Sequence, residues 1–172
     1  MSMSELLSEQ WQVAAQLGEA LKKKSWLLGT AESCTGGLLA GAITAIAGSS
    51  QWFDRGFVTY TNEAKMDMLD VNQAALDKFG AVSEEVAIEM AEGVLNNAPL
   101  STCAVSTTGI AGPDGGTAHK PVGLVCFAVS YRKADGIVTL PFSQNFVGDR
   151  HQVRVQAVIY AMEITRRIVQ EN

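Results

Sequence analysis

The chain has 172 residues, 47% hydrophobic and 18% charged, a composition typical of one globular domain with a sizeable core. Its net charge is −5 at pH 7 and no basic stripe is visible, which argues against nucleic acid as the main partner. The longest apolar runs are far too short to cross a bilayer, so no membrane partner is expected either.

The cysteines and the N-terminus bear on the cellular compartment. Cys34, Cys103 and Cys126 are odd in number and widely spaced, without a Cys-x-x-Cys pair. This pattern indicates reduced thiols, not a disulfide framework or a zinc site. The first ten residues also lack the basic-then-apolar order of a signal peptide. We therefore expect a cytoplasmic location.

The first half of the chain predicts helices alternating with strands. Leu6, Val13, Leu17 and Leu21 have the spacing of one apolar helix face, which predicts a helix over about residues 4–24. The expected elements that follow are, in order, a strand over about 26–31, a helix over about 35–46, a turn at about 51–53, a strand over about 56–60, a helix capped by Thr61 or Asn62, and a short helix over about 74–79.

The second half of the chain begins with a clear helix start. Ser83 is followed by two glutamates, and Pro99 ends the apolar helix face that comes after them. The remaining expected elements are, in order, a strand over about 102–107, a Gly-rich loop over about 109–116, a hairpin of strands over about 122–130 and 137–146 joined across Asp135-Gly136, and a last helix capped by Asp149.

These elements predict the fold class. Helices at both ends, with strands between them, indicate an α/β protein built as a single-domain three-layer α/β/α sandwich. The hairpin makes the sheet mixed, although most of its strands are expected to be parallel. No linker, repeat or low-complexity tract interrupts residues 1–172, so we expect one domain.

The segment from Thr30 to Ile46 has the pattern of a strand, a tight turn and a helix. The turn carries four polar or reactive residues and two glycines that allow a sharp bend, namely Glu32, Ser33, Cys34, Thr35, Gly36 and Gly37. Free N–H groups at a helix start favour an anion or a developing oxyanion. Two interpretations remain open: a nucleophile sits on this turn, or Ser33 or Thr35 caps the helix.

Three polar stretches leave the ends of predicted strands. They are Glu32 to Gly37, Tyr60 to Lys65 and Thr107 to Gly116. Ligand sites of open α/β sheets gather in a crevice at strand ends, so we expect these stretches to converge.

The candidate base for a serine nucleophile is a lysine. His119 and His151 have no acidic partner pattern nearby, which gives little support to a Ser-His-Asp triad. A lysine activates serine if desolvation or nearby positive charge lowers its pKa toward about 7–8. Lys65 is the best placed, and Tyr60 could position it by hydrogen bonding. The alternatives are an exposed helix lysine and a half-buried aromatic ring.

Other reactive residues also have two interpretations. Arg150 and Arg154 are spaced i, i+4 and share a helix face, where they hold either a phosphate or ordinary ion pairs. Cys34 is either a rival nucleophile beside Ser33 or a packed, unreactive thiol. No residues have the spacing of metal ligands, so we expect no metal.

The string Ala31-Glu32-Ser33-Cys34-Thr35-Gly36-Gly37 resembles the AESCTGG signature of the CinA C-terminal domain family. The resemblance continues in order through Ala47-Gly48-Ser49-Ser50, Gly56-Phe57-Val58-Thr59-Tyr60, Asn62-Glu63-Ala64-Lys65, Gly80-Ala81-Val82-Ser83, Gly109 to Gly116, Lys120-Pro121-Val122-Gly123 and Gly148-Asp149-Arg150. It covers nearly the whole chain. One departure is Ser106-Thr107-Thr108, where the family would have a serine directly before the glycine.

The resemblance implies a nicotinamide-nucleotide amidase, which hydrolyses nicotinamide mononucleotide to nicotinic acid mononucleotide and ammonia in pyridine nucleotide recycling. It implies a Ser/Lys pair, carried over as Ser33 and Lys65, and no cofactor. With Tyr60 beside that pair, the expected substrate-binding residues are Glu32, Cys34, Thr35, Gly36, Gly37, Thr107, Thr108, Gly109 and Arg150. The alternative is a non-catalytic nucleotide-binding module of the same fold. Both take a small-molecule nucleotide as partner, and both allow a homo-oligomer.

Overall fold

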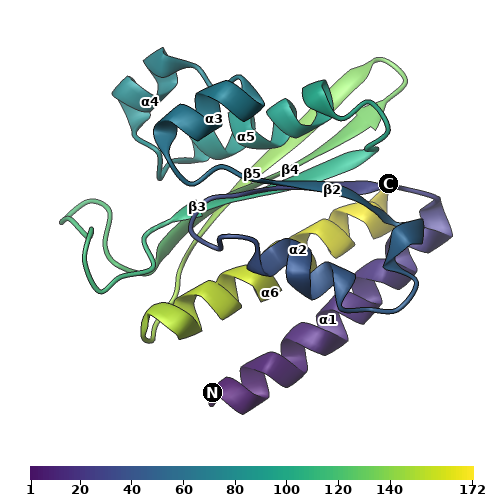
Figure 1. The fold of residues 1–172 in the computed structure, drawn as a ribbon, viewed down its shortest axis with the longest axis horizontal. Helices are drawn as coiled ribbons and strands as arrows, with labels where there is room; N and C mark the ends of the chain where they lie inside the picture. The colour runs from purple at the N-terminus through teal and green to yellow at the C-terminus, as the bar shows by residue number, and fades with distance from the viewer.

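A five-stranded sheet organises the computed structural model, which describes residues 1–172, and six helices cover the sheet (Figure 1). The elements are, in chain order, α1 (Met3–Lys24), β1 (Leu28–Glu32), α2 (Leu38–Thr44), the short 3-10 turn η1 (Ser49–Gln51), β2 (Phe53–Val58), α3 (Asn62–Leu69), α4 (Gln73–Phe79), α5 (Glu84–Asn97), β3 (Cys103–Gly109), β4 (Leu124–Lys133), β5 (Gly136–Asn145) and α6 (Arg150–Glu171).

The strand order is β2-β1-β3-β4-β5. β1 pairs in parallel with β2 and with β3, whereas β4 is antiparallel to both β3 and β5. Four of the five strands therefore run in one direction, and the predicted mixed, mostly parallel sheet is confirmed. In this register Glu32 lies opposite Val58 and Thr107, so the carboxyl ends of β1, β2 and β3 meet at one edge.

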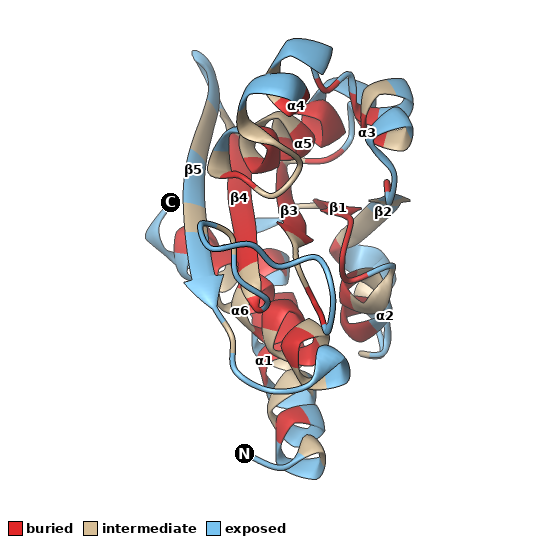
Figure 2. Ribbon diagram, turned by 90° about the vertical axis from the view of Figure 1, so that its left-hand side faces the viewer, coloured by how far each residue is buried: buried red, intermediate tan, exposed pale blue.

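Helices cover both faces of the sheet, which confirms the predicted three-layer sandwich. α1, α2 and α6 lie on one face, and α3, α4 and α5 lie on the other (Figure 1). The central strands β1, β3 and β4 are buried between these layers, as Figure 2 shows. The predicted inward stripe of α1, including Leu17 and Leu21, is fully buried in the larger of the two main core clusters.

Side-chain caps begin three of the helices as the sequence predicts. Thr61 Oγ1 accepts the N–H of Ala64 at 3.0 Å, and Ser83 Oγ accepts the N–H of Val86 at 3.2 Å. Asp149 Oδ1 accepts the N–H of Gln152 at 2.8 Å, and the Gln152 side chain bonds back to the Asp149 N–H. This reciprocal pair fixes where α6 starts, and with it the position of Arg150.

Several element ends differ from the prediction because sheet partners set them. β2 begins at Phe53, which the sequence assigned to a turn, and it ends at Val58 because its neighbour β1 ends opposite at Glu32. β3 continues to Gly109 because β4 pairs with it up to that residue. α2 is shorter than expected, starting at Leu38, and Glu32 belongs to the strand instead of the turn.

Candidate active site

A pocket of about 270 Å³ lies where the three polar stretches meet, at the carboxyl edge of the sheet. Ser33 and Cys34 come from the turn after β1, Tyr60 follows β2, and Arg150 is the first residue of α6. The rest of the wall is the Gly-rich loop, through Gly109, Ile110, Ala111, Gly112, Asp114 and Gly115. The convergence expected from the sequence is therefore present.

Ser33 and Lys65 are in direct contact beside this pocket. Lys65 Nζ lies 3.0 Å from Ser33 Oγ, although the two residues are 32 positions apart in sequence. The Thr61 cap starts α3 directly after β2, and Lys65 in the first turn of this helix is only 1% exposed. The alternative of an exposed helix lysine is therefore wrong.

Lys65 is buried without a carboxylate partner. Its amine contacts the carbonyl oxygens of Thr59 and Tyr60, each at 3.0 Å, and it forms no ion pair. Desolvation by burial lowers the pKa of Lys65 from its ordinary value of 10.5. Lys65 Nζ also donates to Ser33 Oγ, which in turn donates to the Tyr60 carbonyl at 3.4 Å. After loss of one proton, the amine keeps two N–H groups for the two carbonyls and gains a lone pair that can accept the Ser33 proton.

Tyr60 acts on Lys65 through its backbone, not its ring. The acceptor for the lysine amine is the Tyr60 carbonyl oxygen, while the side chain is 59% exposed. This corrects both interpretations made from the sequence, since the phenol does not bond to Lys65 and the ring is more than half exposed. The ring still contributes to the pocket wall.

The start of α2 is capped by Glu32, and neither Ser33 nor Thr35 caps it. The Glu32 carboxylate accepts the N–H groups of Gly37 at 3.1 Å, Leu39 at 2.9 Å and Ala40 at 3.0 Å. These N–H groups are therefore not free for an anion, contrary to expectation. Thr35 Oγ1 donates to the same carboxylate at 2.6 Å, so both side chains are fully occupied behind the pocket.

The other predicted binding residues divide between the pocket wall and the layer behind it. Thr107 Oγ1 contacts Thr35 Oγ1 at 2.8 Å, and Thr108 Oγ1 donates to the Ala81 carbonyl at 2.8 Å, so both threonines are buried supports. Gly36 and Gly37 adopt positive φ angles of 56° and 102°, which serve the turn. Of the predicted glycines, only Gly109 lines the pocket.

Backbone hydrogen bonds hold the turn that carries Ser33. The Ser33 N–H donates to the Thr107 carbonyl at 2.9 Å, and the Gly36 N–H closes the turn onto the Ser33 carbonyl at 3.1 Å. By contrast, the N–H groups of Cys34 and Thr35 donate to no other residue of the protein. Cys34 lines the pocket, so its N–H is available for a developing oxyanion, whereas Thr35 is 0% exposed and is not part of the pocket wall.

Cys34 is unsuited to be the nucleophile. Burial raises the pKa of its thiol to about 12, so the thiolate is scarce at neutral pH. The structure therefore favours the sequence interpretation of a packed, unreactive thiol at this position.

The two arginines on the first turn of α6 have separate tasks. Arg150 Nη1 donates to the Gly112 carbonyl at 2.7 Å, and its remaining N–H groups face no protein acceptor. Arg154 instead binds the turn, with Nε donating to the Cys34 carbonyl at 3.0 Å and Nη2 to the Thr35 carbonyl at 3.2 Å. Neither arginine forms the ordinary ion pair that was one interpretation of the sequence, and the sequence did not predict the clamp by Arg154.

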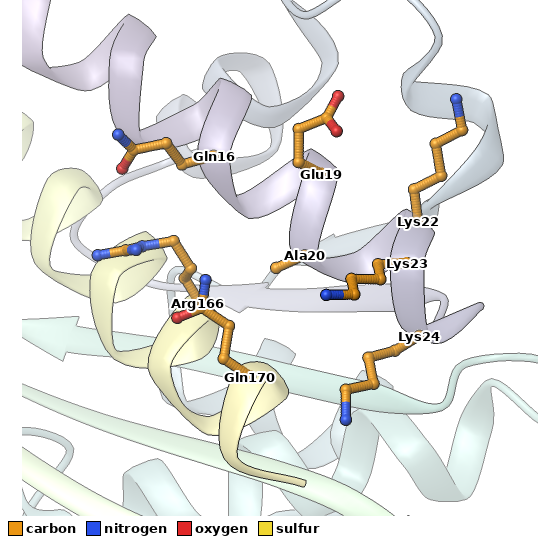
Figure 3. Close-up of a pocket in the computed structure, with 8 residues that line it drawn as sticks. All are labelled: Gln16, Glu19, Ala20, Lys22, Lys23, Lys24, Arg166 and Gln170. Carbon is orange, nitrogen blue, oxygen red and sulfur yellow. The ribbon is translucent and has the colours of Figure 1, made fainter.

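A larger hollow of about 1010 Å³ lies elsewhere, between the C-terminal parts of α1 and α6. Figure 3 shows that the ammonium groups of Lys22, Lys23 and Lys24 point in different directions, while Arg166 turns toward another side. Arg166 is already paired with Glu163 at 2.7 Å. The charges do not converge on one point, so the smaller pocket beside Ser33 is the candidate site.

The structure has neither a cluster of metal ligands nor a helix suited to span a membrane. No three His, Cys, Asp or Glu side chains are grouped so that they could hold a metal ion. None of the helices combines the length and the apolar character needed to span a membrane.

Comparison with known proteins places the chain in a family. Residues 10–169 match the model of the CinA C-terminal domain. The chain is 53% identical to nicotinamide-nucleotide amidohydrolase PncC of Enterobacter agglomerans, and the match covers 91% of this chain and 93% of that protein. It is 52% identical to PncC of Escherichia coli K12, and that match covers 91% of this chain and 92% of the relative. It also resembles the crystal structure of competence/damage inducible protein CihA from Agrobacterium tumefaciens, with a TM-score of 0.87 and 44% identity over 95% of this chain and 96% of that one. The protein therefore belongs to the CinA C-terminal domain family.

Proposed function

We propose that this protein is a nicotinamide-nucleotide amidase, which hydrolyses nicotinamide mononucleotide to nicotinic acid mononucleotide and ammonia as part of pyridine nucleotide recycling. The names of its relatives support the substrate. The observation that carries the proposal is the 3.0 Å contact between Lys65 Nζ and Ser33 Oγ beside a pocket. A nucleophile in contact with a base of lowered pKa is what acyl transfer requires.

In the first half of the reaction, Ser33 Oγ attacks the carboxamide carbon of the substrate while the neutral Lys65 amine takes the hydroxyl proton. The carbonyl oxygen becomes an oxyanion, which the Cys34 N–H stabilises. Lys65 then returns the proton to the amide nitrogen, the C–N bond breaks, and ammonia leaves. The product of this half is an ester between Ser33 and the nicotinoyl group.

In the second half, water hydrolyses this ester. Lys65 takes a proton from the water molecule as its oxygen attacks the ester carbon, and the same N–H group stabilises the second oxyanion. The C–Oγ bond then breaks, and Ser33 recovers its proton from Lys65. Nicotinic acid mononucleotide forms as the carboxylic acid, which loses its proton to water and leaves as the carboxylate.

The phosphoribosyl part of the substrate is assigned to the other wall of the pocket. Arg150 has free N–H donors there and is held in place by the Gly112 carbonyl. The N–H groups of Ala111 and Gly112 also lack a protein acceptor. They can therefore donate hydrogen bonds to phosphate oxygens. With Glu32 occupying the N–H groups of α2, the phosphate belongs to Arg150 and this loop.

The test is to incubate the purified protein with nicotinamide mononucleotide and to measure ammonia and nicotinic acid mononucleotide together. Both products should appear in equal amounts, and the Ser33→Ala variant should form neither. If the protein binds nicotinamide mononucleotide but releases no ammonia, it is instead the non-catalytic nucleotide-binding module.

A further inference from the structure

Arg154 bonds to the catalytic turn from a helix 120 residues away in sequence. Its Nε and Nη2 atoms donate to two successive carbonyls, those of Cys34 and Thr35, at 3.0 and 3.2 Å. The guanidinium forms no ion pair with a carboxylate, so its charge acts on these two peptide groups. Arg154 is not part of the pocket wall.

The contact with the Cys34 carbonyl fixes the orientation of the turn. This carbonyl shares its peptide plane with the Thr35 N–H, which points the opposite way in a trans peptide. Because Thr35 is fully buried and is not part of the pocket wall, this peptide group supplies no oxyanion donor.

The Thr35 carbonyl is linked to the Cys34 N–H through one more hydrogen bond. The Thr35 carbonyl shares its peptide with the Gly36 N–H, which donates to the Ser33 carbonyl at 3.1 Å. The Ser33 carbonyl in turn shares its peptide with the Cys34 N–H. Hydrogen bonds in such a chain polarise one another, so the guanidinium strengthens the Cys34 N–H as a donor.

We propose that Arg154 is a positioning residue for hydrolysis, which fixes the turn after Ser33 and polarises the Cys34 N–H for the oxyanion. This inference rests on the proposed function for the substrate and for Ser33 as the nucleophile. Because the oxyanion exists only after Ser33 attacks, loss of Arg154 should lower kcat and leave substrate binding unchanged.

The first experiment compares Arg154→Gln with wild type and with Arg166→Gln, which removes an arginine from the same helix far from the turn. With nicotinamide mononucleotide, Arg154→Gln should lower kcat about 10- to 100-fold, with KM changed less than about twofold. Arg154→Lys should be intermediate, because an ammonium lacks the planar fork that binds both carbonyls. Arg166→Gln should match wild type. Melting temperatures of all variants show whether the fold is kept.

A second experiment tests the same inference without the nucleotide. A fluorophosphonate reacts with an activated serine by forming an Oγ–P bond and expelling fluoride, and its phosphoryl oxygen occupies the oxyanion position. Arg154→Gln should be labelled at Ser33 about 10-fold more slowly than wild type. If wild type is labelled but releases no ammonia from nicotinamide mononucleotide, the proposed substrate is wrong and this comparison still decides the role of Arg154.

Three outcomes would overturn the inference. An Arg154→Gln variant with wild-type kcat shows that the turn needs no clamp. A rise in KM at constant kcat makes Arg154 a substrate-binding charge instead. If a fluorophosphonate labels Ser33 at the same rate in folded Arg154→Gln and in wild type, the strength of the Cys34 N–H donor does not depend on the guanidinium.

Discussion

Two ionisable side chains close to Ser33, those of Glu32 and Lys65, are buried to the same degree but have different surroundings. Glu32 is 0% exposed and Lys65 is 1% exposed. Three backbone N–H groups and the Thr35 hydroxyl bond to the Glu32 carboxylate. Lys65 contacts two carbonyls and the Ser33 hydroxyl, with no opposite charge.

The different surroundings indicate different roles: Glu32 supports the structure of the turn, whereas Lys65 is suited to chemistry. Both oxygens of Glu32 are engaged by the backbone of α2, so this side chain organises the turn and has no part left for a substrate. The charged form of Lys65 is disfavoured, since burial lowers its pKa without a compensating ion pair. The environment of Lys65 suits a side chain that gains and loses a proton during a reaction.

Removing the nucleophile should have the largest effect. Ser33→Ala is expected to lower kcat at least about 10³-fold, because no other group can form the covalent intermediate. The measurement is ammonia release from nicotinamide mononucleotide. A variant that keeps more than a tenth of wild-type kcat would show that Lys65 serves some other nucleophile.

Removing the base should come next. Lys65→Met has similar volume but cannot accept a proton, and it is expected to lower kcat at least about 10²-fold. Lys65→Arg should fail as well, because arginine stays protonated. The assay is again ammonia release, with circular dichroism to check the fold. If Lys65→Arg works within a few-fold of wild type, Lys65 is a binding charge.

The lowered pKa of Lys65 should also appear in two pH profiles. kcat/KM should rise as pH passes through this pKa, below its ordinary value of 10.5, because the neutral amine is the active form. The unfolded chain binds this proton more tightly than the folded one, so stability should rise with pH between the folded and the unfolded pKa. Denaturation of Lys65→Met at several pH values should lack this rise; an equal slope in both proteins contradicts it.

The same contrast shows what the sequence could and could not predict. Ser33 and Lys65 were predictable because both follow strands whose ends must meet in a parallel sheet. The cap by Glu32 was not, because its carboxylate reaches across the turn to N–H groups five to eight residues ahead. Usual cap patterns place the side chain directly before the helix.

Contacts made by backbone atoms could not be predicted from the sequence either. The acceptor for Lys65 is the Tyr60 carbonyl, which every residue type offers, so no side-chain pattern marks it. The clamp by Arg154 depends on packing α6 beside a turn 120 residues away. Local signals did better, since the caps at Thr61, Ser83 and Asp149 lie within three residues of the N–H groups they bind.

Replacing the Glu32 carboxylate should lower stability more than it changes catalysis. In Glu32→Gln, one side-chain oxygen becomes an amide nitrogen that meets backbone N–H donors, which should lower the free energy of unfolding by about 1–3 kcal/mol. Urea denaturation measures this loss. The surviving folded protein should keep the pH profile of wild type, because Lys65 is untouched. A shifted profile would show that the two buried charges are coupled.

The smallest effect is expected at Cys34, the residue between the two environments. Its side chain is buried and the pKa of its thiol is raised to about 12, while its N–H is the backbone donor available to the oxyanion. Cys34→Ala keeps that N–H and removes only the thiol, so kcat should change less than about threefold. A thiol-reactive reagent supplies a second readout, because a scarce thiolate should react slowly at neutral pH. If Cys34→Ala lowers kcat about 10³-fold and Ser33→Ala stays active, the thiol is the nucleophile. The contact between Lys65 and Ser33 is then not the catalytic pair.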